Sequence, residues 1–260
     1  HEEARHLPGH ELAITSNEAF NLEKLPRRIC IVGGGYIAVE FAGIFHGLGV
    51  ETILIYRGEK ILRGFDEDLR DHLAAEMQKK GIEIRTRSDV SKIEKSGDGV
   101  RITLEDGAVF GAGHVMFATG RLPNVVNLGL ENAGVDLTPH YAVKVDEYSR
   151  STAENIYAVG DVTNRVNLTP VAIREGQTFA DNVFGGQDVK TDHSLIPTAV
   201  FSQPEIGTIG LTEAQARKDY AKIDIYKTSF RPMKHTLSGR DERMLMKLVV
   251  DGETDRVLGC

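Results

Sequence analysis

The chain has 260 residues, of which 41% are hydrophobic, and its formal net charge is −7 at neutral pH. This composition is ordinary for a soluble globular protein, and the acidic balance without a basic stripe argues against a nucleic-acid partner. No apolar run approaches the length of a membrane span and no signal peptide opens the sequence, so we expect no membrane contact. The two cysteines, Cys30 and Cys260, fit neither a disulfide framework nor a zinc site, and we expect a reduced, cytoplasmic protein without a metal.

The stretch up to about Pro26 is expected to be a connection, with one short capped helical turn near Thr15–Phe20. The apolar run Ile29–Val32 then predicts a buried parallel strand over 28–32, and Gly33–Gly35 follow it as a turn too tight for a Cβ. The next residues predict a helix over 36–48, because apolar side chains recur at helical spacing. These side chains are Ile37, Phe41, Ile44, Phe45 and Leu48.

The order of strand, glycine turn and helix is typical of a dinucleotide-binding unit. In such a unit, backbone N–H groups and a helix N-terminus face a pyrophosphate. Gly33 makes the turn, Gly35 lets the phosphate approach, and Ala38 stands where a third glycine would allow helix and strand to pack. The alternative is an ordinary glycine-rich loop without a ligand.

The second strand, Val50–Tyr56, indicates which dinucleotide is bound. In NAD-binding units an Asp or Glu near the end of this strand accepts a hydrogen bond from the ribose 2′-OH. Tyr56 stands there instead, and Arg57 and Arg63 follow it. A guanidinium pairs with the 2′-phosphate of NADP, whereas a carboxylate would repel it, so the sequence favours NADP. The alternative is that both arginines are solvated surface charges.

The remaining elements up to residue 121 complete a Rossmann-like α/β domain, which we place at 1–121. They are a helix near 66–80 ending at Gly81, a strand at 82–85, an antiparallel meander at 90–93, 99–104 and 108–110, and a buried strand at 114–118.

Residues 122–190 form a second predicted domain. Its expected elements are strands at 142–145 and 155–159, and a helix to about Phe184 with Thr169 as N-cap and Pro170 at the first helical position. The second strand runs directly into Asp161. A carboxylate at the carboxyl end of a strand can accept hydrogen bonds from sugar hydroxyls, although it can equally cap the following turn.

Residues 191–260 form a third predicted domain of mixed α and β structure. Its expected elements are antiparallel strands at 197–201 and 206–211, a helix capped by Thr212 and ending near Tyr220, and strands near 222–230, 244–251 and 256–260. The chain contains no paired cysteines, no metal-binding helix and no nucleophile elbow, so we assign no catalytic and no metal-binding residue. His193 and His235 lie in loops and are expected to be structural or solvated.

Six segments resemble the flavin-dependent pyridine-nucleotide disulfide oxidoreductases and occur in that family's order along nearly the whole chain. They are 33–43, 56–66, 117–121, 157–161, 168–172 and 196–202. Within the family the chain is most similar to the glutathione reductases, with the trypanothione reductases close behind. The resemblance implies a homodimeric enzyme in which NADPH passes a hydride to FAD and the flavin then reduces glutathione disulfide through a redox-active disulfide.

The resemblance also assigns residues to cofactors. For NADPH, the resemblance implies that the turn glycines bind the coenzyme, and that Gly34, Ile37 and Glu40 line its site. Arg57 and Arg63 would hold the 2′-phosphate, and Gly120 would contact the cofactor. Asn167 and Ala199 would lie near the nicotinamide. Tyr36 would be a mobile lid over the flavin. Asp161 and Thr169 would bind FAD, at the ribityl and pyrophosphate side and near the isoalloxazine respectively.

The family's redox-active cysteine pair and its His-Glu pair are absent from this sequence. The resemblance therefore implies a piece of a longer enzyme, with an NADPH domain, part of a split FAD domain and a truncated dimerisation domain, and no turnover by this chain alone. Gln177 stands where several glutathione reductases have an Arg that binds substrate, and Arg174 lies one helical turn earlier. The alternatives are a module that only binds NADPH, a trypanothione reductase, and an NAD-dependent dihydrolipoamide dehydrogenase, which Arg57 and Arg63 disfavour.

Overall fold

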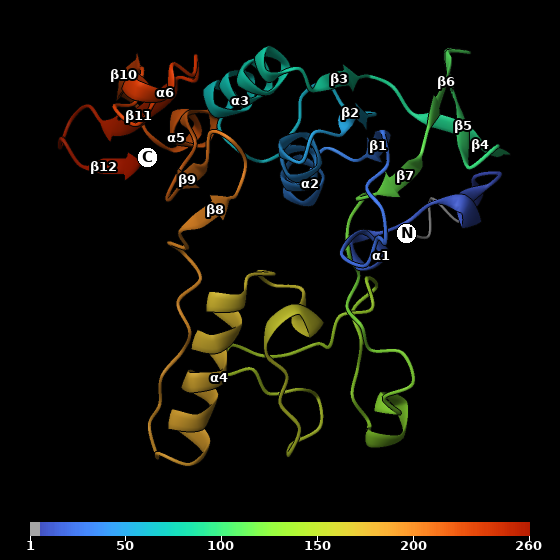
Figure 1. Cartoon of the computed structure of the whole chain (residues 1–260). Helices are drawn as coiled ribbons and strands as arrows, with labels where there is room; N and C mark the ends of the chain where they lie inside the picture. Colours follow the sequence, from blue (N-terminus) through green and yellow to red (C-terminus); the bar gives the residue numbers. More distant parts are fainter. Residues whose placement is uncertain (1–5) are drawn as a thin grey trace. The chain divides into compact units, whose positions relative to one another are not determined.

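The computed structural model describes residues 6–260, which form two compact units. The first unit combines the chain up to Gly120 with Pro197–Cys260, and the second is Arg121–Ile196. Figure 1 traces both along the chain. In the N-terminal connection, α1 (Ser16–Ala19) is capped by Thr15 in a capping box with Glu18, as predicted. The part of this connection before residue 6 lies outside the described residues.

A four-stranded parallel sheet in the order β3-β2-β1-β7 lies at the centre of the first unit. Its strands are β1 (Arg28–Val32), β2 (Glu51–Tyr56), β3 (Glu83–Thr86) and β7 (His114–Phe117). In the register, Ile31 pairs with Leu54 of β2 and with Met116 of β7, and all three side chains are buried. The four predicted strands and their parallel arrangement are therefore confirmed.

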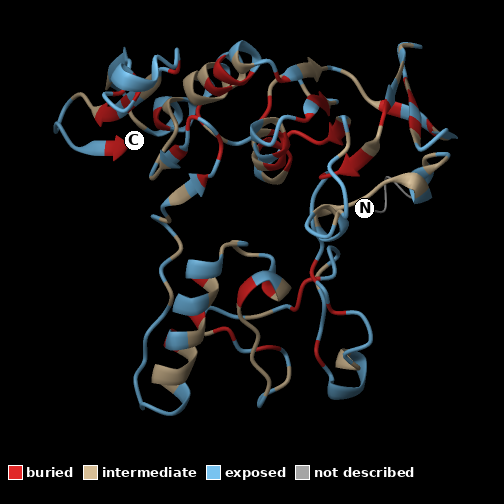
Figure 2. Ribbon diagram, viewed as in Figure 1, coloured by how far each residue is buried: buried red, intermediate tan, exposed pale blue. Residues whose placement is uncertain are grey.

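The two faces of this sheet are covered by different structures. Helices α2 (Tyr36–Gly47) and α3 (Glu67–Lys80) share a core with Ile31, whereas Val32 points into a second core on the other face, because side chains alternate along a strand. The second core is completed by the predicted antiparallel meander of β4 (Val90–Ser96), β5 (Gly99–Leu104) and β6 (Val109–Ala112). Figure 2 shows the buried residues concentrated in β1, β2 and α2.

The buried face of α2 differs from the predicted stripe. Phe41 and Phe45 are buried as expected, but Ile44 and Leu48 are 47% and 58% exposed. The rest of the buried face consists of Ala38, Val39 and Ala42. Small side chains let a helix lie close to its strands, so the stripe follows the alanines as well as the largest apolar residues, and the prediction for Ile44 and Leu48 was wrong.

The second unit contains one long helix, α4 (Thr169–Val183), and short 3-10 turns that include η4 (Gly160–Thr163). The strands predicted at 142–145 and 155–159 are wrong, because the described residues there make only single bridges. A ladder needs a neighbouring extended segment of similar length, and these runs meet one for a single residue pair. The helix is confirmed, but its N-cap is Leu168, so Thr169 is its first residue and the predicted cap was one residue late.

The segment after Pro197 joins the first unit. Its elements are β8 (Thr198–Val200), β9 (Ile206–Thr208), α5 (Glu213–Asp219), β10 (Ile223–Phe230), α6 (His235–Ser238), β11 (Met244–Asp251) and β12 (Val257–Gly259). Apart from α6, these elements were predicted, including the capping box of Thr212 with Gln215. Val200 and Ile206 lie in the same core as α2 and α3. None of the helices in residues 6–260 combines the length and apolar content needed to cross a membrane.

The orientation of α2 can be tested with two alanine substitutions. Phe45 is 3% exposed, and we expect Phe45→Ala to lower the free energy of unfolding by about 3–5 kcal/mol through lost burial and a cavity. Leu48→Ala should change it by no more than about 0.5 kcal/mol, because that side chain faces solvent. Urea unfolding followed by circular dichroism measures both, and equal losses would contradict this orientation.

Candidate functional site

A pocket of about 360 Å³ opens at the carboxyl end of β1, where the glycine turn leads into α2. Residues at the carboxyl ends of β2 and β7 line the same pocket, which is the place where ligands bind in open parallel sheets. Eight predicted cofactor residues line it, namely Gly33, Gly34, Gly35, Tyr36, Ile37, Arg57, Arg63 and Gly120. Other lining residues, including Leu7, Asp89 and Thr119, were not predicted as site residues from the sequence.

The turn accepts only glycine at its first two positions. Gly33 has φ +144°, and a Cβ there would lie 2.4 Å from the carbonyl oxygen of Ala118. A Cβ on Gly34 would lie 2.5 Å from the ring of Tyr56. At Gly35 no atom lies within 4 Å of the Cβ position, so the backbone there faces open space that a ligand can enter.

The N-terminus of α2 is suited to an anion. Gly35 is the N-cap and supplies no side-chain hydrogen bond to the first N–H groups, and the first turn contains no acidic residue. These N–H groups and the helix dipole therefore point toward the pocket without a competing carboxylate in the first turn of α2. A pyrophosphate fits this end of the pocket.

Two guanidinium groups border the pocket beyond the end of β2. Tyr56 ends the strand, and Arg57 and Arg63 both line the pocket. Asp89 lines it too, so the arginines share this rim with one carboxylate. Asp89 follows β3 in the chain, and no spacing rule linked it to the glycine turn. The geometry thus brings together the glycine turn and the two arginines that the sequence predicted.

The loop that carries these arginines is held against the domain at several points. The N–H of Leu62 donates to the carbonyl of Gly34 at 2.6 Å. The guanidinium of Arg70 donates to the carbonyls of Lys60 and Ile61, at 2.7 Å each. Ile61 and Leu62 are each 1% exposed. The segment between Arg57 and Arg63 is therefore anchored to both the glycine turn and α3.

Two other predicted residues lie outside this pocket. Glu40 of α2 accepts a hydrogen bond at 2.9 Å from the backbone N–H of Phe201, just after β8. Ala199 is an exposed residue of β8. The structure thus places both at the contact between α2 and the segment after Pro197, and their role toward NADPH stays a prediction.

The remaining predicted residues lie in the second unit, around the start of α4. Asp161 is an exposed residue of η4, and Thr169 is the exposed first residue of α4. The side chain of Asn167 donates to that of Asn164 at 3.0 Å. The exposed carboxylate and hydroxyl fit the polar parts of a flavin nucleotide, and their assignment to FAD stays a prediction.

A buried acid that the sequence did not reveal holds the turn before Asp161. Glu175 of α4 is 1% exposed and accepts a hydrogen bond from the N–H of Gly160 at 2.6 Å. Its other oxygen meets Arg165 at 2.9 Å and His193 at 2.7 Å. In the sequence, Glu175 looks like an ordinary polar residue of a helix, because Gly160, Arg165 and His193 contact it only in the folded structure. His193 is thus a structural contact, as expected.

Two sequence profiles match the chain. The profile of the pyridine nucleotide-disulphide oxidoreductases matches residues 4–176. The chain belongs to this family. The profile of the family's dimerisation domain matches residues 196–260. Enzymes of this family use FAD and NADP(H), which agrees with the chemistry of the pocket. In the described residues no group of three or more His, Cys, Asp or Glu side chains could hold a metal ion.

The chain is similar to curated members of the family over almost its whole length. It is 54% identical to a glutathione reductase of Burkholderia cepacia and 51% identical to one of Nostoc, in each case over 98% of this chain. It is 46% identical to a trypanothione reductase of Trypanosoma congolense over 97% of this chain. It spans 57%, 58% and 52% of these three relatives.

A solved structure supports the same family fold. The HOCl-induced flavoprotein disulfide reductase RclA from Escherichia coli superposes with a TM-score of 0.91 over 98% of this chain and 59% of RclA, at 30% sequence identity. The expected fold class, a Rossmann-like parallel sheet with an antiparallel meander and a further α+β part, is therefore confirmed for this family member.

The buried contacts of Glu175 predict a specific loss of stability. Glu175→Gln keeps the shape but leaves the charge of Arg165 without its buried counterion, and we expect a loss of about 2–3 kcal/mol in the free energy of unfolding. Glu147→Gln is the matched control, because Glu147 pairs with Lys190 at the surface and should cost under about 1 kcal/mol. Urea unfolding measures the free energy of unfolding of both variants, and similar losses would show that the buried contacts of Glu175 stabilise the fold no more than a surface ion pair does.

Proposed function

We propose that this chain is the NADPH-binding part of a flavoprotein that reduces glutathione disulfide. The observation that carries the proposal is the pair Arg57 and Arg63 at the rim of a glycine-turn pocket, at the end of β2. Two guanidinium groups at this position favour a coenzyme with a 2′-phosphate over one with a free 2′-hydroxyl. The identity of 54% to a glutathione reductase supports the same assignment of coenzyme and substrate.

The residues of the first unit orient the coenzyme. Gly33, Gly34 and Gly35 admit the pyrophosphate to the N-terminus of α2, where N–H groups and the helix dipole bind it. Arg57 and Arg63 hold the 2′-phosphate. Tyr36 is 42% exposed at the start of α2, and we assign it the role of a mobile lid over the flavin, with Ile37 and Gly120 as further lining residues of the pocket.

In the second unit, Asp161 and Thr169 would hold FAD, and Asn167 would contact the nicotinamide. In the first unit, Ala199 would have the same role as Asn167, and Glu40 would line the NADPH site. The flavin would supply the two-electron carrier that couples NADPH oxidation to disulfide reduction. The chain's own contribution there is to position polar groups, with Glu175 fixing the backbone at Gly160.

The substrate assignment rests on the relatives and on α4. Gln177 donates to Asp181 at 2.8 Å on the exposed side of α4, and Arg174 is exposed one turn earlier. An exposed guanidinium can bind a glutathione carboxylate bidentately. Arg174 would therefore replace the arginine that several glutathione reductases have at the position of Gln177. The identity of 46% to a trypanothione reductase makes trypanothione disulfide the second candidate.

The full enzyme is proposed to be a cytoplasmic homodimer. The match of residues 196–260 to a dimerisation domain supports the assembly. We also propose domain boundaries at 121 and 190, close to the limits Gly120 and Ile196 of the compact units. A chain that only binds NADPH is the alternative for the isolated polypeptide.

The coenzyme preference can be tested on the isolated chain. We expect NADPH to raise its melting temperature more than NADH at equal concentration, because stabilisation follows the ratio of ligand concentration to dissociation constant. The double variant Arg57→Gln, Arg63→Gln should weaken NADPH binding by about 100-fold or more and leave NADH binding unchanged. Arg101→Gln, an exposed arginine of β5, is the control. An unchanged preference in the double variant would refute the NADP assignment.

The substrate can be tested on the full-length parent enzyme. We expect it to consume NADPH with glutathione disulfide, and to do so faster than with trypanothione disulfide. Arg174→Gln should raise KM for glutathione disulfide by about tenfold, because one charge-assisted contact is lost. A parent enzyme that binds FAD and NADPH but ignores glutathione disulfide would refute the substrate. Disulfide reduction by the purified 260-residue chain alone would refute the expectation that it has no turnover.

A further inference from the structure

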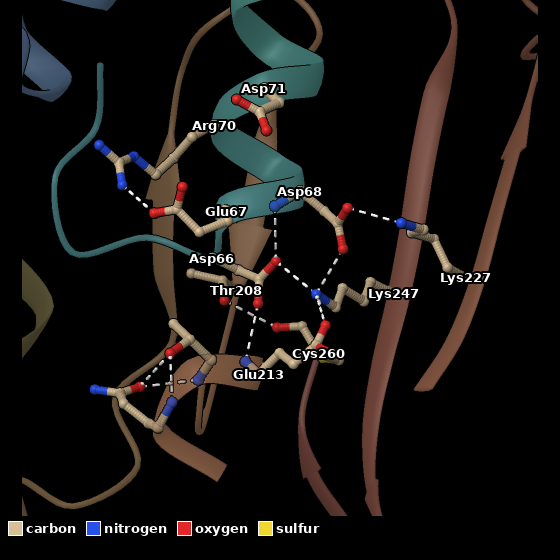
Figure 3. Close-up of polar contacts among 12 residues, drawn as sticks. Asp66, Glu67, Asp68, Arg70, Asp71, Thr208, Glu213, Lys227, Lys247 and Cys260 are labelled. Carbon is tan, nitrogen blue, oxygen red and sulfur yellow. Dashed lines mark hydrogen bonds and ion pairs between the residues drawn. The ribbon is translucent and has the colours of Figure 1, made fainter. Parts of the chain in front are cut away.

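A buried lysine ties the coenzyme domain to the segment after Pro197. The side chain of Lys247, in β11, is 6% exposed and lies within 2.8 Å of Asp66, 2.7 Å of Asp68 and 2.7 Å of Glu213. Lys227 of β10 also meets Asp68, at 2.7 Å. Figure 3 shows the ammonium group of Lys247 pointing into the space between the three carboxylates. We refer to Asp66, Asp68, Glu213 and Lys247 as the lysine cluster.

The charges of the lysine cluster are balanced by its surroundings. Three carboxylates face Lys247, Lys227 and Arg217, which pairs with Glu213 at 2.6 Å. Burial alone would lower the pKa of Lys247, but the hydrogen bonds to its three acids raise it above the usual value. The pKa of Glu213 is lowered by Lys247 and Arg217. These pKa shifts favour the charged forms of Lys247 and Glu213.

Asp66 connects the lysine cluster to the loop that carries Arg57 and Arg63. It is the N-cap of α3, where Oδ1 accepts from the N–H of Asp68 at 3.0 Å and from Lys247, while Oδ2 accepts from the N–H of Glu213 at 2.9 Å. Asp66 also ends the loop that begins at Arg57 and carries Arg63. Removing Lys247 would leave two acids of α3 close together and partly buried, so the loop end would shift to separate them.

We propose that Lys247 is a positioning residue for the 2′-phosphate site, acting through Asp66 on the loop that carries Arg57 and Arg63. This rests on the proposed binding of NADPH. The proposed pyrophosphate site is the glycine turn between β1 and α2. The loop contacts this turn at Leu62, whose N–H donates to the carbonyl of Gly34, whereas Lys247 acts four residues further on, at Asp66. Lys247 therefore affects the part of the coenzyme that distinguishes NADPH from NADH, and leaves the shared part in place. By linkage, NADPH binding in turn stabilises the contact between α3 and β11.

The test uses the full-length enzyme and the variants Lys247→Gln and Lys247→Arg, with Lys222→Gln as the control. Lys222 precedes β10 and donates to the carbonyl of Gly252, just after β11, at 3.0 Å, away from the lysine cluster. Dissociation constants of NADPH and NADH are measured by fluorescence titration. We expect Lys247→Gln to weaken NADPH binding by about tenfold, with NADH binding unchanged. A tenfold change is what the loss of one charge-assisted contact between a loop arginine and the 2′-phosphate would cause. Lys247→Arg should recover most of the loss, and Lys222→Gln should change neither constant.

Equal weakening of both coenzymes by Lys247→Gln would overturn the proposal, since it would indicate a general loss of structure. Unchanged NADPH binding would overturn it as well. If Lys247→Gln does not fold, Asp68→Asn carries the same test, because Asp68 contacts both lysines, and it should weaken NADPH selectively. A wild-type enzyme without preference for NADPH would instead refute the proposed function, which separates the two failures.

Discussion

The glycine turn after β1, where a Cβ finds no room at Gly33 or Gly34, is the constraint on which the rest of this structure depends. A phosphate can reach main-chain N–H groups only where no Cβ intervenes, and Gly33 and Gly34 occupy positions where any other residue would collide with Ala118 or Tyr56. The parallel sheet places this turn at the end of β1, and α2 directs its N-terminus at the same point. The electrostatics of the pocket then follow from the helix and from the arginines beyond β2.

The coenzyme pocket is supported by packing on both faces of the sheet and by the segment after Pro197. One core joins α2 and α3 to Val200 and Ile206, so residues far apart in the sequence share the same buried volume. The lysine cluster adds a polar contact between α3 and β11 at the edge of that core. The loop that carries Arg57 and Arg63 is thus held both by this core, through Ile61 and Leu62, and by the ion pairs of the lysine cluster at Asp66.

The sequence predicted the elements whose signals are local. The strand, glycine turn and helix around Gly33 and the caps at Thr15 and Thr212 each depend on neighbouring residues, and each was found. The sequence prediction failed where the structure of a segment depends on residues that are distant in the sequence. The strand expected at 155–159 has only one bridge, and Ile44 faces solvent because smaller residues contact the sheet.

The same distinction holds for the candidate site. The glycines and both arginines lie within about ten residues of a strand end, so spacing rules found them. Asp89 lines the pocket from the loop between β3 and β4, and Glu175 and Lys247 are charged residues whose buried partners come from elsewhere in the fold. No local pattern distinguishes such residues from surface charges, since the difference lies in their burial.

The central claim is that two guanidinium groups beside a glycine turn bind a phosphorylated adenosine ribose. A crystal structure of this chain grown with NADPH tests it most directly. We predict density for the pyrophosphate against the N–H groups at Gly34 and Gly35, and for the 2′-phosphate between Arg57 and Arg63. A 2′-phosphate in solvent away from both arginines, or a nucleotide bound at a different place on the chain, would contradict the account.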